Sequence, residues 1–312
     1  MNRDLTDNRT KGILLMVAFA VFGPVIDTFA KLSAQAIPAG EVALARFAVQ
    51  AAILLPLTIL LGRAHRPDRR EMMLHLARGG LILVATALFF RAIKDMAIAD
   101  AISIFFIEPL LVVLAGGFFL GEPVGWRRIA ACIVGFFSAL LVIQPSFEEF
   151  GWVAILPVGT AILFTFYLLL TRTMTAKTDP LALQAYTAIG ALVIIVPVTI
   201  AGEVFSLGPL DPVMPQGIFW FYMFGVGVAA AIAHLFISFA FKYAPASILA
   251  PLQYLEIVAA TFFGYVVFGN LPNDLTYIGV SIIIGSGMYV FWRERQISKA
   301  PRPPNQEIAP GP

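Results

Sequence analysis

The sequence predicts an all-α integral membrane protein whose ten transmembrane helices form two inverted five-helix repeats. Three observations predict this class: the composition, a series of apolar runs, and a repeated segment that carries charges inside an apolar run. Of the residues, 59% are hydrophobic and 13% are charged, against roughly 25% charged in an ordinary soluble domain. A soluble protein of 312 residues could not cover its surface with so few charges.

The apolar runs are long enough to cross a bilayer, at about 1.5 Å of helical rise per residue. Short links that carry charges, Pro or Gly join them, so no soluble domain interrupts the series. We expect helices over residues 12–33, 40–61, 73–93, 97–120, 125–144, 151–171, 181–202, 216–240, 246–268 and 274–292. Residues 1–11 are expected to be a cytoplasmic N-terminus, and the Pro-rich residues 294–312 a disordered cytoplasmic tail.

The distribution of Lys and Arg predicts the orientation of these helices. Basic residues gather on alternate links, at residues 3–11, 63–70, 127–128, 172–177, 242 and 293–302. Cytoplasmic links are the ones enriched in Lys and Arg, so both termini are expected in the cytoplasm. That placement requires an even number of crossings, and ten satisfies it.

A segment of the first half recurs at an offset of 148 residues. The first copy reads AIKDMAIADAISIFFIEPLLVVLAGGFFLGEP over 92–123, and the second reads AFKYAPASILAPLQYLEIVAATFFGYVVFGNL over 240–271. The matches at this offset include Lys94 with Lys242, Glu108 with Glu256, Gly116 with Gly264, and Gly121 with Gly269. A weaker match at offset 141 pairs residues 56–59 with residues 197–200.

The two halves are expected to enter the membrane in opposite orientations. A division near residue 146 gives repeats over 12–145 and 146–293 with five helices each, and five is odd. Lys94 accordingly falls on an outer link and its match Lys242 on an inner one. Inverted repeats are typical of secondary transporters, which bind substrate near the midplane between the halves. We expect a cavity walled by the third, fourth, eighth and ninth helices and touched by the first and sixth.

Ionisable residues inside apolar runs are costly, which makes them candidate functional residues. Glu108 and Glu256 either meet a substrate ammonium or carry a coupling proton, or else they are structural carboxylates paired inside the bundle. Arg46 has Gln50 on the same helical face. It holds a substrate carboxylate through two parallel hydrogen bonds, or neutralises Glu41 or Glu108, or lies too near the outer interface to contact substrate.

Other polar residues have more local explanations. Asp27 is expected to pair with Lys31, which lies four residues later on the same helix. His234 is interpreted as a satisfied hydrogen-bonding residue rather than a proton relay, although it lies where it could touch substrate. Three scattered histidines and one cysteine give no metal-ligand spacing, and no cofactor is expected.

The remaining candidates surround these charged residues. Glu108, Glu256, Arg46 and His234 are candidate substrate contacts. The further candidates are Gln253, Tyr254, Phe89, Phe90, Phe105 and Tyr167. Candidate hinges are Pro109, Pro251, Gly116 and Gly264, because Pro and Gly interrupt or loosen a helix. The aromatic residues as a group suit an apolar or aromatic ligand with a polar head.

Several short motifs carry a resemblance to a known family. They are Ala43-Leu44-Ala45-Arg46-Phe47, Phe106-Ile107-Glu108-Pro109, Leu120-Gly121-Glu122-Pro123 and Gly135. With these motifs the sequence resembles the EamA-type branch of the drug/metabolite transporter superfamily over roughly residues 12–293. The second half departs from the family pattern at Phe268-Gly269-Asn270, where Gly-Glu is usual. Within the branch the chain is most similar to YddG-type exporters of aromatic and neutral amino acids.

The resemblance implies a secondary transporter of the bacterial inner membrane that exports small amphipathic metabolites, foremost aromatic and neutral amino acids, by alternating access. It implies a monomer whose partners are a small-molecule substrate and membrane lipid, with no nucleic acid. One rival function on the same fold is import of a vitamin, a nucleoside or S-adenosylmethionine. Another is a membrane-embedded lipid enzyme, which would need clustered His, Asp or Ser at the interface; the sequence shows no such cluster and no phosphate-binding loop for ATP.

Overall fold

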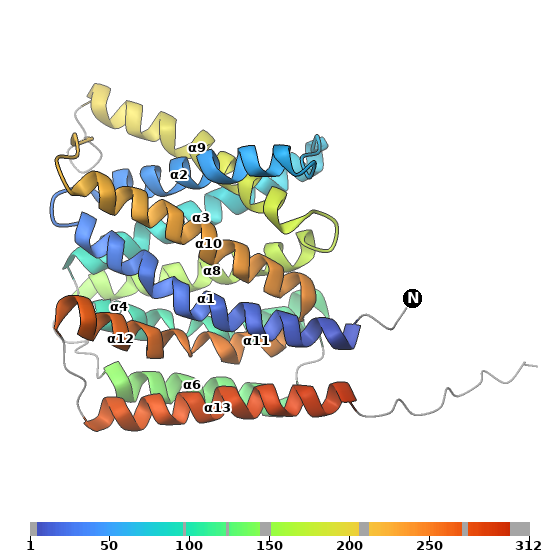
Figure 1. Cartoon of the computed structure of the whole chain (residues 1–312). Helices are drawn as coiled ribbons and strands as arrows, with labels where there is room; N and C mark the ends of the chain where they lie inside the picture. Colours follow the sequence, from blue (N-terminus) through green and yellow to red (C-terminus); the bar gives the residue numbers. More distant parts are fainter. Residues whose placement is uncertain are drawn as a thin grey trace, which may run out of the picture.

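The computed structural model describes residues 5–95, 98–122, 125–143, 151–205, 212–269 and 274–299, in which all regular structure is helical. The helices pack side by side in one bundle (Figure 1). They are α1 (Leu5–Ser33), α2 (Ala39–Leu60), α3 (Arg69–Asp95), α4 (Ile98–Phe105), α5 (Glu108–Leu120), α6 (Trp126–Ile143), η1 (Gly151–Ala154), α8 (Ile155–Met174), α9 (Pro180–Phe205), α10 (Phe219–Tyr243), α11 (Ala246–Gln253), α12 (Glu256–Phe268) and α13 (Asp274–Lys299).

Within the described ranges, seven helical segments are long and apolar enough to cross a membrane. They are Arg9–Ser33, Ala39–Leu60, Arg69–Asp95, Gly151–Met174, Pro180–Phe205, Phe219–Tyr243 and Ala246–Phe268. Shorter apolar helices cover Glu108–Leu120, Ile129–Ser138 and Tyr277–Ser286. These lengths and compositions agree with the predicted all-α membrane class.

The predicted fourth and ninth helices are each broken in the middle. α4 ends at Phe105 and α5 begins at Glu108, while α11 ends at Gln253 and α12 begins at Glu256. Pro109 lies in the first turn of α5, where its missing N–H removes no helical hydrogen bond. Pro251 lies inside α11, two residues before that helix ends, and a proline there weakens the ladder of hydrogen bonds.

The sequence repeat is also a repeat of helix ends. α11 and α12 begin and end 148 residues after α4 and α5. α5 and α12 each run for 13 residues and stop at a glycine in the left-handed conformation, Gly121 with φ 62° and Gly269 with φ 72°. This conformation favours glycine because a side chain would clash with the backbone.

The two breaks contact each other. The hydroxyl of Tyr254 donates a hydrogen bond of 3.0 Å to the backbone carbonyl of Phe106, its counterpart 148 residues earlier. The two rings lie 5.7 Å apart. Gly135 of α6 gives the Tyr254 ring its room, since a Cβ at that position would overlap the ring. The two breaks thus cross in direct contact at Phe106 and Tyr254.

Contacts between the two halves also gather at one end of the bundle. In Figure 1 the start of α1 and the end of α13 lie at the same end, as does the link between α2 and α3. There Arg63 pairs with Asp179 at 3.1 Å. Glu122 pairs with Arg172 at 3.1 Å, and it also accepts the backbone N–H of Ser247 at 3.2 Å.

α3 and α9 approach each other closely at glycines. A Cβ at Gly79 would lie 2.5 Å from the backbone nitrogen of Ala191, and a Cβ at Gly190 would lie 2.8 Å from the backbone oxygen of His75. Small residues at such a crossing allow close helix packing in membranes. The neighbouring Gly80 has more room, because a Cβ there would meet the flexible end of Ile194 at 3.2 Å.

We predict that Gly79→Ala destabilises the protein, because the added methyl group meets backbone that cannot rotate away. Overpacking of this kind costs about 1–3 kcal/mol. Gly80→Ala is the matched control and should unfold near the wild-type temperature. Thermal unfolding followed by size-exclusion chromatography in detergent measures both variants, and equal stability of the two would contradict the proposed close packing.

Candidate functional site

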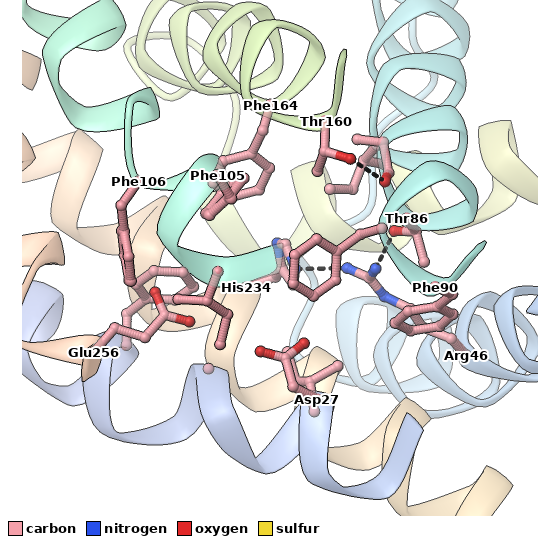
Figure 2. A pocket seen from close by; sticks show the side chains of 17 residues that line it. Asp27, Arg46, Thr86, Phe90, Phe105, Phe106, Thr160, Phe164, His234 and Glu256 are labelled. Atoms are coloured by element: carbon pink, nitrogen blue, oxygen red, sulfur yellow. Dashed lines mark hydrogen bonds between the residues drawn. The ribbon is translucent and has the colours of Figure 1, made fainter. Parts of the chain in front are cut away.

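A cavity lies among seven helices, α1, α2, α3, α4, α8, α10 and α12 (Figure 2). Six phenylalanines line it, namely Phe19, Phe89, Phe90, Phe105, Phe106 and Phe164. Four of its other lining residues are ionisable, namely Asp27, Arg46, His234 and Glu256. The walls are therefore apolar and aromatic, with a few charged groups that face the same space, as is typical of small-molecule sites.

Arg46 brings the positive charge to this cavity from α2. Its side chain is 4% exposed, and its Nη1 donates to the hydroxyl of Thr86 on α3. Its Nη2 lies 2.6 Å from Nε2 of His234 on α10. Its Nε is buried and has no acceptor among the described residues. One donor of the guanidinium is therefore unsatisfied within the described residues.

Asp27 of α1 lies beside Arg46 and projects toward it from the opposite wall (Figure 2). The expected pair of Asp27 with Lys31 is not formed, since no ion pair joins these two described residues. Instead Lys31 lies over the ring of Phe268, 5.2 Å from its centroid. The prediction was wrong because helical spacing shows which neighbours a residue has on its own helix, whereas the nearest opposite charge comes from α2.

Glu256 reaches the cavity because α1 has a glycine opposite it. A Cβ at Gly23 would lie 2.5 Å from a carboxylate oxygen of Glu256, so any larger residue would displace the carboxylate. At the repeat offset of 141 residues the counterpart of Gly23 is Phe164 of α8. A bulky ring in one half therefore occupies the position that a glycine leaves open in the other.

Glu108 is placed differently from its repeat partner. Its side chain is fully buried and does not line the cavity. Neither of its carboxylate oxygens has a hydrogen bond of ordinary geometry within the described residues, and the buried amide nitrogen of Gln253 also lacks one. Gln253 and Tyr254 lie with Glu108 at the crossing of the breaks rather than on the cavity wall.

Tyr167 also lies behind the wall. Its hydroxyl oxygen is 3.0 Å from Nδ1 of His234, 2.9 Å from Nη2 of Arg78 and 3.1 Å from the amide nitrogen of Gln184. Of the candidate substrate contacts, the ones that line the cavity are Phe89, Phe90, Phe105, Arg46, His234 and Glu256. All the helices that were expected to border the cavity do so, and α2 borders it as well.

Sequence reasoning missed several polar residues of the site. Arg78 is fully buried in α3, and its position inside the predicted third apolar run was a signal that could have found it. Thr86 and Thr160 line the cavity, yet a lone threonine in an apolar helix gives no distinctive pattern. Within the part of the chain that the structure describes, no group of three or more His, Cys, Asp or Glu side chains could hold a metal ion.

Comparisons with known proteins place this arrangement among transporters. The chain is 26% identical to a riboflavin transporter of Vibrio cholerae over 94% of this chain and 96% of that protein. It is 25% identical to an S-adenosylmethionine uptake transporter of Rickettsia felis over 86% and 88% of the two chains. It is 23% identical to a pseudopaline exporter of Pseudomonas aeruginosa over 88% and 93%.

A solved crystal structure with no stated function has the same fold, with a TM-score of 0.72 at 18% identity, over 95% of this chain and 99% of that chain. The model of the EamA-like transporter family matches residues 10–144 and 151–292. These ranges include all the helices that form the cavity and both broken helices. The chain is a multi-pass membrane protein that belongs to the EamA-like transporter family.

Proposed function

We propose that this protein is a secondary transporter that takes up a heteroaromatic metabolite with a polar tail, foremost riboflavin, across the bacterial inner membrane. The observation that carries the proposal is the composition of the cavity, in which six phenylalanines surround one arginine and two carboxylates. Aromatic walls suit a flat ring system, which gains both apolar burial and ring–ring contact.

The charged groups suit a ligand that both donates and accepts hydrogen bonds. Arg46 offers a free Nε–H, and Asp27 offers carboxylate oxygens beside it (Figure 2). A flavin presents carbonyl oxygens next to an imide N–H along one ring edge, which matches such a pair. A ligand oxygen that accepts a hydrogen bond from the buried guanidinium contributes more binding free energy than the same hydrogen bond in water. The reason is that a charge in a low-dielectric site is otherwise poorly solvated.

The relatives support uptake of this class of compound over the amino-acid export that the sequence favours. Riboflavin and S-adenosylmethionine both combine a heteroaromatic ring system with a polar chain, and their transporters match almost the whole length of this protein. The shared chemistry of these two compounds is what we assign to the cavity.

Export of a zwitterion such as an amino acid is the second candidate. Opposite charges face the cavity, with Arg46 suited to a carboxylate and Asp27 or Glu256 suited to an ammonium group. A relative named as an exporter of pseudopaline also matches most of the chain. The EamA-like fold therefore serves both directions of transport among the relatives of this protein.

The decisive experiment is transport in proteoliposomes with separate panels of riboflavin, S-adenosylmethionine and aromatic amino acids. We expect saturable entry of riboflavin. If one site accepts both compounds, unlabelled S-adenosylmethionine should reduce the rate of riboflavin entry. Liposomes without protein give the background rate. Transport of phenylalanine or tryptophan, with no entry of riboflavin or S-adenosylmethionine, would favour the zwitterion exporter instead.

We also propose ten crossings with both termini in the cytoplasm, with repeats over 12–145 and 146–293. The repeated helix ends support the two-repeat organisation, and the shared end of α1 and α13 supports the placement of the termini. In this orientation the ion pairs Arg63–Asp179 and Glu122–Arg172 lie at the cytoplasmic end. For the cavity to open toward the cytoplasm, these ion pairs between the halves then have to separate. The hinges for this movement are Pro109, Pro251, Gly116 and Gly264.

Cysteine labelling tests the orientation. Arg66 and Met214 are exposed, and they lie on links that we place on opposite sides of the membrane. In spheroplasts a membrane-impermeant maleimide should label Met214→Cys directly and Arg66→Cys only after permeabilisation. The unsubstituted chain is the control, because its single cysteine, Cys132, is buried. Labelling of both positions from one side contradicts the proposed topology.

The charged residues of the cavity give a separate prediction. Asp27→Asn and Arg46→Gln keep the approximate shape of each side chain and remove its charge. Each should lower riboflavin uptake by about tenfold or more, because hydrogen bonds to charged groups contribute about 1.5–3 kcal/mol. Arg91→Gln is the matched control, since Arg91 belongs to an exposed pair with Asp95 outside the cavity. If all three variants take up riboflavin at the wild-type rate, at equal membrane levels, the charges of Asp27 and Arg46 do not take part in the site.

A further inference from the structure

We propose that Tyr167 and Arg78 are positioning residues that fix the His234 ring in the tautomer protonated at Nδ1, and thereby hold Arg46 in the cavity. Neither Tyr167 nor Arg78 lines the cavity, so both act through His234. The effect on substrate affinity rests on the proposed function, whereas the tautomer of His234 does not.

The first step is the contact between Arg46 and His234. Nη2 of Arg46 lies 2.6 Å from Nε2 of His234. A guanidinium has only donors, so Nε2 of His234 has to be the acceptor. A proton on Nε2 would place two N–H groups against each other at this distance. The ring is therefore neutral and carries its proton on Nδ1, which fixes a choice that coordinates alone leave open.

The second step is the partner of Nδ1. This nitrogen lies 3.0 Å from the hydroxyl oxygen of Tyr167, which accepts its hydrogen. The same oxygen accepts from Nη2 of Arg78, which uses the second of its two lone pairs. The amide nitrogen of Gln184 lies 3.1 Å from this oxygen, but its two hydrogens are taken by the backbone carbonyl of His234 and the hydroxyl of Ser238. The orientation of the Gln184 amide is set by the backbone carbonyl of His234, to which its nitrogen donates at 2.9 Å. Donors on α3 and α10 thus converge on Tyr167, and its oxygen is the acceptor that orients His234.

The third step is the anchoring of Tyr167 by Arg78. The Nε of Arg78 donates to the hydroxyl of Thr171 at 3.0 Å, and its Nη1 donates to the carbonyl of Leu183 at 3.2 Å and to the hydroxyl of Thr187. Its guanidinium also lies over the Tyr167 ring, 4.5 Å from the centroid. All three nitrogens of Arg78 are thus engaged by protein, and the side chain has a fixed position.

The two buried arginines therefore differ in a way that assigns their roles. Arg78 has acceptors for every nitrogen, whereas Arg46 keeps a buried Nε without one. Without the acceptor at Nε2 of His234, Arg46 would be drawn toward Asp27, the carboxylate that faces it across the cavity (Figure 2). That movement would take the free donor away from the ligand. The tautomer of His234 is therefore part of the recognition of a substrate acceptor group.

Nitrogen-15 NMR of histidine-labelled protein in nanodiscs tests the tautomer directly. The chain has three histidines, so the signals of His234 are assigned by their loss in His234→Gln. We expect Nδ1 protonated and Nε2 unprotonated in the wild type, and a change of both signals in Tyr167→Phe. A wild-type ring protonated at Nε2, or a Tyr167→Phe spectrum identical to the wild type, would overturn the proposal.

Binding of riboflavin and of S-adenosylmethionine, measured by calorimetry, tests the consequence. Tyr167→Phe should lower the affinity for whichever compound binds by about tenfold, which is the effect expected for loss of one hydrogen bond in a charged network. His234→Gln, whose amide oxygen can replace Nε2 as acceptor, should weaken it less than His234→Leu. Tyr222→Phe on α10 is the matched control, because Tyr222 lies outside this network and the cavity.

Equal affinities of Tyr167→Phe and Tyr222→Phe, with both folded, would reject the positioning role. A greater loss in His234→Gln than in His234→Leu would reject the requirement for an acceptor at Nε2. If neither compound binds the wild type, the proposed function fails, and the NMR measurement still decides the tautomer. The two proposals are thus judged by separate results.

Discussion

The hydrogen bond between Tyr254 and the carbonyl of Phe106 is the contact around which the rest of the molecule is organised. A helix that breaks inside a membrane exposes backbone groups that lipid cannot satisfy, so a break is tolerated only where protein or a polar cavity surrounds it. Here each break meets the other, and one break supplies the donor for the free carbonyl of its counterpart. α12 begins at Glu256, two residues after Tyr254, and Phe105 and Phe106 line the cavity. The site therefore lies beside the place where the two breaks satisfy each other.

The sequence predicted those features that depend on residues near one another along the chain. Long apolar runs located the helices, and the matched pairs around Glu108 and Glu256 anticipated helix ends that recur at 148 residues. It could not separate the roles of those two glutamates, because the room that lets Glu256 face the cavity comes from Gly23 on another helix. It also assigned Asp27 to a partner on its own helix, since the facing charge on α2 becomes a neighbour only after packing.

The comparison of the two arginines explains how a pseudosymmetric fold gains an asymmetric site. At the position equivalent to Arg46 the second half carries Thr187, which accepts a hydrogen bond from Arg78. The same place in the two repeats thus holds a cavity-lining arginine in one half and a structural acceptor in the other. Proteins with different named substrates are similar to this chain, and exchange of a few polar residues within one aromatic cavity would be a direct way to change what is bound.

Arg78 has a consequence for how the chain is assembled. It belongs to the third helix, yet its acceptors lie between Tyr167 and Thr187, in α8 and α9, which the ribosome makes roughly a hundred residues later. A charged side chain without partners is costly in the bilayer core. Until α8 and α9 are inserted, Arg78 has to remain near a headgroup or water. The first half alone therefore offers α3 no stable position in the bundle. Insertion of the N-terminal half and its final packing are therefore separate events in time, and the late helices complete the early one.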